Sequence, residues 1–271
     1  MATITDIRPT PALTEPVAPS RLTRTWSSWW PPLLGLLLIA GVAELLVRGG
    51  VLGPRTPTIS EIVTAAVELG GSADLWTASL VSGRILLQGL VIGTLVGVLA
   101  GSVIGGVPLL RRAVGPLVLA LYATPFIALI PVLLIIFGFG TVGKTVIVSL
   151  LVFMTVTLQV AAGMENIDIV YFEVSDSFRT PWHRRWREVM LPAAAPYIIA
   201  GVRLGLGRAL TGVVVAEFET RLTGLGGLIM TNALALKVAE ATVPALLIAV
   251  VGISLTTLLR RAEKRFKVWK V

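Results

Sequence analysis

Long runs of apolar residues are the feature that most limits what this chain can fold into. A helix that crosses a bilayer needs about 20 mostly apolar residues. Six windows meet that requirement, at residues 31–48, 85–106, 114–137, 145–163, 193–217 and 241–259. With 55% hydrophobic and 14% charged residues, the chain also lies outside the composition of soluble domains. The sequence therefore predicts an all-α membrane protein with six transmembrane helices.

The distribution of Lys and Arg predicts the orientation, because positive side chains near helix ends are retained on the cytoplasmic face. Fifteen of them precede the first window, lie in the second and fourth connections or follow the last window, against six in the other connections. Both termini and the fourth connection are therefore expected to be cytoplasmic. The net charge of +8 is then explained by topology. The protein is expected to lie in a lipid bilayer and not to bind nucleic acid.

Three regions follow from this pattern. Residues 1–30 are rich in Thr and Pro without apolar periodicity, which predicts a disordered cytoplasmic tail. Residues 31–260 form the transmembrane domain, and residues 261–271 form a basic cytoplasmic tail. Trp26, Trp29 and Trp30 are expected as interfacial anchors. No secretory signal is evident.

Two local patterns lie near the first window. Glu44 and Arg48 have the i,i+4 spacing of an ion pair, and a buried functional acid is the alternative for Glu44. Thr58 to Glu61 has the form of a capping box. It predicts a short surface helix that ends at Gly70 and Gly71.

Glycines recur every fourth residue in the second window. Small residues at this spacing form one stripe along a helix and allow another backbone to approach closely in a membrane. The stripe predicts a tightly packed helix pair, within one subunit or between subunits. Its members are Gly89, Gly93, Gly97, Gly101 and Gly105.

Residues 138–145 satisfy the pattern G-x-x-x-x-G-K-T of nucleotide-binding phosphate loops. Such a loop follows a buried strand, whereas an apolar run with Pro125 and Pro131 precedes this one. The charge distribution also places the turn outside the cell. We therefore interpret Lys144 as an interfacial charge that reaches toward water and expect no nucleotide site.

Residues suited to catalysis or metal binding are few. The chain has no cysteine, and His183 is its single histidine, so neither a metal site nor a Ser/His dyad is expected. No cofactor is predicted. Ionisable groups deep in the windows are also scarce, which disfavours a proton-coupled carrier and indicates that the energy comes from outside this chain.

The connection at residues 164–192 is exceptionally charged, with five acidic and four arginine side chains from Glu165 to Pro192. Val174 and Phe178 are spaced i,i+4, as are Trp182 and Trp186. Apolar ridges within a charged rim are typical of a protein interface. The alternative is a segment that lies on the membrane surface.

Residues 173–192 resemble the cytoplasmic coupling loop of importer-type ABC permeases. Glu173, Val174 and Ser175 stand in place of the E-A-A triplet, Arg179 occupies the glycine position, and Leu191 and Pro192 close the motif. The resemblance continues in other segments, which are similar to the nitrate, taurine and aliphatic-sulfonate branch of the family. They are Pro125-x-x-Ala128-x-x-Pro131, Phe137-Gly138-x-Gly140, Gly201-x-x-Leu204-Gly205, Val215-Ala216-Glu217 and Gly224-Leu225-Gly226.

The resemblance implies a dimeric permease that works with a cytoplasmic ABC ATPase and an extracytoplasmic solute-binding protein. It implies that residues 164–192 contact the ATPase, and that Pro125, Pro131 and Glu217 belong to the translocation path. The permease itself would carry no catalytic residue, and its cargo would be a small anion such as a sulfonate, taurine or nitrate.

Arg179 departs from the family pattern. Glycine there would adopt a left-handed conformation that costs another residue about 1–2 kcal/mol. We expect Thr180 and Pro181 to encode the break instead, with Thr180 as the cap of a second loop helix and Pro181 at its first position.

Three alternatives remain open at this stage. The chain could be a stand-alone secondary carrier or channel, with the loop as a topological anchor only. It could be a permease for a thiamine-precursor-like heterocycle. A membrane-bound enzyme is disfavoured, because the chain lacks the residues for a nucleophile or a metal site.

Overall fold

The computed structural model describes residues 30–51, 53, 55–221 and 223–266, and all regular elements in this part are helical. Residues 1–29 of the predicted tail, with Trp26 and Trp29, and the last five residues of the chain lie outside the described part. The chain divides into two compact units, Met1–Ile59 and Ser60–Val271. The elements are α2 (Trp30–Arg48), α3 (Ile59–Gly70), α4 (Ala73–Gly106), α5 (Pro108–Ala123), η1 (Phe126–Leu129), α6 (Ile130–Phe137), α7 (Thr141–Glu165), α8 (Ile169–Ser177), α9 (Trp182–Arg184), η2 (Arg185–Met190), α10 (Leu191–Thr220), α11 (Leu225–Leu234) and α12 (Val238–Phe266).

In the first unit, Glu44 near the end of α2 contacts both Arg48 and Ile59, the last residue of that unit. Its carboxylate pairs with Arg48 at 2.8 Å, which confirms the predicted ion pair. The other carboxylate oxygen accepts the backbone N–H of Ile59 at 2.6 Å. Glu44 therefore has a structural role within this unit.

The short helix predicted after the capping box is confirmed as α3, which ends at Gly70. Most of its residues are exposed, as expected for a surface helix. Ala65 is its buried residue, in a cluster with Leu75, Ala78, Leu225 and Val243. This contact holds α3 against α4, α11 and α12.

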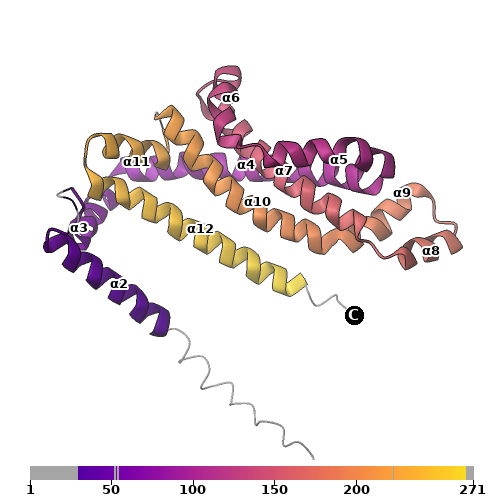
Figure 1. Ribbon diagram of the computed structural model, residues 1–271, viewed down its shortest axis with the longest axis horizontal. Coiled ribbons are helices and arrows are strands. Elements are labelled where there is room, and N and C mark those ends of the chain that lie inside the picture. The colour runs from indigo at the N-terminus through magenta and orange to yellow at the C-terminus, as the bar shows by residue number, and fades with distance from the viewer. Residues whose placement is uncertain (1–29, 52, 54, 222, 267–271) are drawn as a thin grey trace, which may run out of the picture. The chain divides into compact units, whose positions relative to one another are not determined.

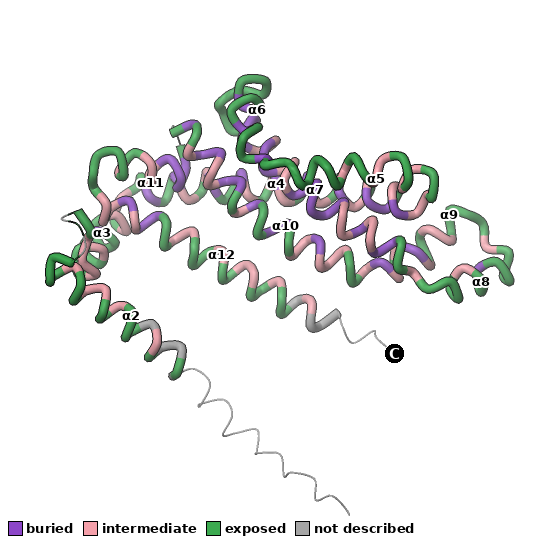
Figure 2. Tube along the Cα trace, in the orientation of Figure 1, coloured by how far each residue is buried: buried purple, intermediate pink, exposed green. Residues whose placement is uncertain are grey.

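The centre of the second unit is formed by α4, α7 and α10, with α7 packed against both of the others (Figure 1). Figure 2 shows that the buried residues concentrate on these three helices. The core consists of Ile85 from α4, a valine ladder from α7, and Ala209 and Val213 from α10. The ladder is Val148, Val152, Val156 and Val160.

The glycine stripe of α4 lies directly on α7. A Cβ atom built on Gly101 would lie 2.6 Å from the Thr157 carbonyl oxygen, and one on Gly105 would lie 2.5 Å from that of Ala161. A Cβ on Gly89 or Gly93 would come within 2.4 Å of an atom of α7, and one on Gly97 within 2.9 Å. The Thr157 hydroxyl also donates to the Gly97 carbonyl at 3.4 Å. Because a lipid bilayer gives helices little hydrophobic drive to associate, such close backbone contact is a main source of their attraction.

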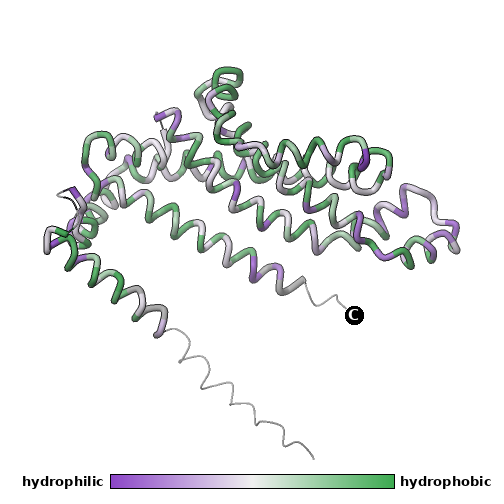
Figure 3. The backbone as a smooth tube through the Cα atoms, in the orientation of Figure 1, coloured by the Kyte–Doolittle hydropathy of each residue, from purple (hydrophilic) through white to green (hydrophobic). Residues whose placement is uncertain are grey.

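Four described helices are long and apolar enough to cross a membrane: Ala73–Gly106, Thr141–Glu165, Trp182–Thr220 and Val238–Arg261. Figure 3 shows hydrophobic residues along all four. They contain the second, fourth, fifth and sixth predicted windows. The first window forms α2, and its crossing and the orientation of the termini stay predictions. The last helix continues to Phe266, into the predicted tail.

The third predicted window, residues 114–137, is interrupted by a bend, and its crossing of the membrane stays a prediction. It covers most of α5 and all of the η1–α6 segment, which are bent by 85° relative to each other, and Figure 1 shows α6 turning away from α5. Thr124, which precedes Pro125, has an extended ψ of 137°. A residue before proline is disfavoured in the α conformation, so the helix ends there. Pro131 lies in the first turn of α6, where proline is tolerated.

We expect Gly101→Ala to destabilise the protein by about 1–3 kcal/mol, because the new methyl group would meet a backbone atom of α7 that cannot move aside. Gly83→Ala on the same helix is the matched control, since a Cβ there has no neighbour within 4 Å. The unfolding temperature of the detergent-purified variants measures the difference. Equal temperatures would show that α4 and α7 are not in close contact.

Candidate functional site

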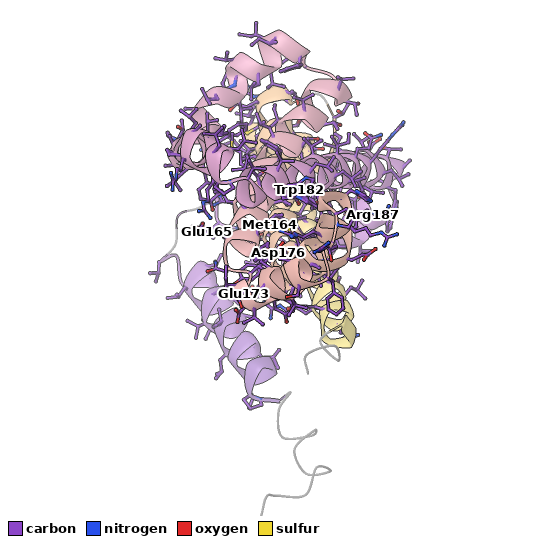
Figure 4. The ribbon with its side chains drawn as sticks, turned by 90° about the vertical axis from the view of Figure 1, so that its right-hand side faces the viewer. Met164, Glu165, Glu173, Asp176, Trp182 and Arg187 are labelled. Carbon is purple, nitrogen blue, oxygen red and sulfur yellow. The ribbon has the colours of Figure 1, made fainter. Side chains whose placement is uncertain are left out.

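The charged connection begins where α7 ends at Glu165. Asp168 caps the next helix, because its carboxylate accepts the N–H of Val170 at 3.0 Å. The resulting helix, α8, carries Glu173, Val174 and Ser175. Figure 4 views this end of the molecule, with α8 and the α9–η2 segment in front, and Figure 3 shows hydrophilic residues gathered there.

The break after α8 is formed by Arg179 itself. Arg179 has a left-handed φ of 51°. Its N–H donates to the Asp176 carbonyl, and the Thr180 N–H donates to the Ser175 carbonyl, both at 2.9 Å. This pair of bonds is the Schellman motif that glycine normally supports. The expectation that other residues replace the left-handed position was wrong.

The predicted cap of a second loop helix was also wrong. The residue at the N-cap of α9 is Pro181, with ψ 150°, and no side chain caps the helix. α9 continues through the π-helical segment η2 into α10, so Trp182–Thr220 forms one helix. Leu191 and Pro192 therefore lie within it. Pro192 has no N–H to donate, and the i→i+5 bond from Leu191 to Trp186 accommodates the interruption.

Contacts within the connection hold α8 against the start of this long helix. Arg185 forms an ion pair with Asp176. Trp182 and Trp186 pack edge to face with ring centroids 5.5 Å apart. Trp186 also lies against Gly106 at the end of α4, where a Cβ would come within 2.8 Å of the indole ring. Trp186 is thus part of the packing between the connection and the helices.

One face of α8 is apolar and exposed. Phe178 is 80% exposed, Tyr171 56% and Val174 51%, and helical spacing puts them on the same side. Tyr171 was missed in the sequence, although its position three residues before Val174 was the signal. Glu173 is exposed nearby, whereas Ser175 is buried and donates to the Phe172 carbonyl. α8 therefore presents an aromatic ridge with charged neighbours.

Arg179→Gly should stabilise the turn between α8 and α9 by about 1 kcal/mol, because glycine adopts the left-handed conformation without the steric cost that arginine incurs. Arg179→Val should destabilise the turn. Amide hydrogen exchange of residues 176–182 measures both effects. Slower exchange in the valine variant than in the glycine variant would contradict the assigned conformation.

The phosphate-loop pattern at residues 138–145 forms the turn between α6 and α7, so a helix precedes it and not a strand. The Lys144 side chain is only 1% exposed, and its ammonium donates to the hydroxyl and carbonyl of Thr223 at 3.0 and 3.3 Å. The interpretation of Lys144 as a water-seeking charge was wrong. Lys144 ties α7 to the segment before α11.

Glu217 is buried among three helices, with 0% exposure. The Ser82 hydroxyl donates to its carboxylate at 2.7 Å, and the Gly226 N–H donates at 2.8 Å. The Ser82 oxygen in turn accepts the Leu225 N–H at 2.8 Å. Gly224 has a φ of 92°, and a Cβ there would collide with the carboxylate. Glu217 therefore links α4, α10 and α11, and its place in the translocation path stays a prediction.

We expect Glu217→Ala to destabilise the protein by roughly 2–3 kcal/mol, because it leaves the buried Gly226 N–H without its acceptor and removes an opposite charge near Lys144. Glu219→Ala is the matched control, since Glu219 is exposed on the same helix. The unfolding temperature in detergent distinguishes the two. Equal losses in both variants would rule out a special role for the buried carboxylate.

A cavity of about 220 Å³ lies between the bent α5–η1–α6 segment and the helices α7 and α10. Pro125 lines it, whereas the exposed Pro131 does not. Arg208, near the middle of α10, also lines it. The sequence count of scarce deep charges missed Arg208 and Arg203, although both lie inside the window at residues 193–217. Among the described residues, no three His, Cys, Asp or Glu side chains are grouped as metal ligands.

The comparison with known protein families decides the identity. Residues 93–268 match the binding-protein-dependent transport system inner membrane component. The chain belongs to this family. It is a multi-pass inner membrane protein and a transport subunit, and members of the family leave ATP hydrolysis to a separate subunit.

Several named permeases are similar along most of the chain. SsuC of Bacillus subtilis (strain 168), named for aliphatic sulfonates, is 28% identical over 89% of this chain and 88% of its own. The taurine transport permease TauC of Escherichia coli (strain K12) is 26% identical over 80% of each chain. The bicarbonate permease CmpB of Synechocystis sp. is 23% identical over 72% of this chain and 74% of its own.

Proposed function

We propose that this protein is the permease subunit of an ATP-binding-cassette importer for a small anion, and that residues 164–192 dock on its ATPase. The exposed aromatic ridge of α8 carries the proposal. An exposed phenylalanine beside a tyrosine and a valine, surrounded by charges, has the composition of an interface anchor with its rim.

The contacts of α8 support a role in transmitting force. The Schellman turn at Arg179 and the Arg185–Asp176 ion pair fix α8 relative to the long helix that becomes α10. Trp186 packs on α4, and Arg111 of α5 lies 3.5 Å from Glu165 at the end of α7. A displacement of α8 by a bound ATPase would therefore reach α4, α5, α7 and α10. We infer that the helices convert this motion into alternating inward and outward opening.

A homodimer completes the proposed path. None of the residues of α5 is buried, and Figure 2 shows most of α5 and most of α6 exposed. Residues of α5 and α6 form part of the wall of the cavity that Arg208 also lines. A charged side chain facing lipid is costly, so a second copy covering a water-filled path explains the arrangement better than lipid does. An extracytoplasmic solute-binding protein would deliver the solute to this path.

The names of the relatives support an anionic cargo. Sulfonates, taurine and bicarbonate appear in the names of permeases that match most of the chain, and nitrate stays a prediction from the sequence. A heterocycle is the second candidate. The riboflavin transport permease RibX of Chloroflexus aurantiacus is 32% identical, although over only 44% of this chain and 45% of its own.

We expect Phe178→Asp to weaken association with the ATPase at least tenfold, because it replaces an exposed apolar anchor with a charge. Glu173→Ala should weaken it less. Ile169→Asp is the matched control, since Ile169 is 66% exposed on α8 but lies on the opposite face. Co-purification of the ATPase encoded with this permease measures all three.

Unchanged association in both Phe178→Asp and Glu173→Ala would contradict the docking role of the loop. The remaining interpretation would then be a stand-alone carrier or channel. Solute uptake by vesicles that contain the permease alone, without ATPase, would support that interpretation directly.

A further inference from the structure

The cavity beside the bend at Pro125 has a wall of unusual chemistry for a membrane protein. Most of its lining is apolar, and its polar groups are Arg208, Tyr122 and the threonines 124, 155 and 211. Each threonine hydroxyl donates to the backbone carbonyl four residues before it. The guanidinium and the phenol are therefore the groups in this wall with hydrogens left to donate.

Arg208 is held in place without being neutralised. Its Nη2 donates to the Tyr122 hydroxyl at 3.0 Å, and its guanidinium carbon lies 5.5 Å from the centre of the Tyr122 ring. No ion pair joins Arg208 to a carboxylate in the part of the chain that the structure describes, whereas Arg203 pairs with Glu263 at 2.9 Å. The contrast shows that α10 carries one paired arginine and one that keeps most of its N–H groups free.

Arg208 lies within a helix that is long and apolar enough to cross a membrane. Ionisable side chains inside membrane-spanning helices nearly always face a water-filled cavity or a partner, and they mark solute pathways. Tyr122 lies just before the 85° bend between α5 and the η1–α6 segment. The Arg208–Tyr122 contact therefore joins α10, which begins in the charged connection, to the hinge of the bent pair.

We propose that Arg208 and Tyr122 form the recognition site for the acidic head group of the transported solute. Guanidinium is planar and donates two parallel hydrogen bonds to a carboxylate or a similar oxyanion such as a sulfonate. Tyr122 accepts from Arg208 and so has its own O–H available for the same head group. The cavity is smaller than the roughly 300–1,000 Å³ of drug-sized sites, which suits a small solute. The inference rests on the proposed function as an importer of anions.

The test uses the complete transporter in proteoliposomes, with its ATPase and solute-binding protein, and a panel of labelled taurine, an alkanesulfonate, nitrate, bicarbonate and riboflavin. We expect Arg208→Gln to reduce anion uptake at least tenfold. It should also raise the Kd of the same anion for the purified permease–ATPase complex at least tenfold. Arg208→Lys should lose less, because it keeps the charge but not the planar fork, and Tyr122→Phe should raise the Kd severalfold.

Arg260→Gln is the matched control, because it removes an exposed arginine of α12 outside the cavity, and it should keep wild-type uptake and Kd. Co-purification with the ATPase shows which variants are folded. If Arg208→Gln does not fold, the Kd values of Arg208→Lys and Tyr122→Phe test the site instead. If the wild type takes up the anion and the folded variants bind it with the wild-type Kd, the proposed site is wrong. The proposed importer function would not be affected by that result. Uptake of riboflavin and of no anion would overturn the anionic cargo and this site together, independently of the ATPase association.

Discussion

The close contact between α4 and α7 determines how the central helices are arranged. Five glycines on one stripe remove the side chains that would otherwise keep the two backbones apart, and a valine ladder on α7 fills the space that they leave. In a bilayer this contact matters more than apolar burial, because lipid is as apolar as the helix surface. Because one side of α7 packs against α4, the other side of α7 packs against α10. The cavity lies between these two helices, α7 and α10, and the bent α5–η1–α6 segment.

A second constraint lies at the Glu217 carboxylate. The segments Val215-Ala216-Glu217 and Gly224-Leu225-Gly226 are two separate motifs in the sequence. In the structure the second wraps around the side chain of the first, and Ser82 completes the shell. A buried carboxylate is tolerated only when its oxygens are hydrogen-bonded, so glycine at 224 and 226 is needed to bring the backbone close. Lys144 adds an opposite charge nearby.

The charged connection is mechanically continuous with the transmembrane helices. Residues Trp182 to Thr220 form one helix that includes a π-helical segment. The same helix therefore carries Trp182 in the charged connection and Arg208 in the wall of the cavity. This continuity gives a direct route between the proposed ATPase contact and the proposed solute site. The left-handed Arg179 sets the angle at which α8 leaves that element.

The sequence by itself determined the helical membrane class, the family, the apolar windows, the Glu44–Arg48 pair and the α3 helix. These follow from local periodicity, spacing and motif order, which need no knowledge of neighbours. Only the tertiary structure decided that Glu217 is enclosed, that Lys144 is buried on Thr223, and that the window at residues 114–137 bends at Pro125. It also placed Arg208 beside Tyr122, 86 residues away in the chain. Such outcomes depend on which distant backbone approaches a side chain, and hydropathy along one segment carries no information about that approach.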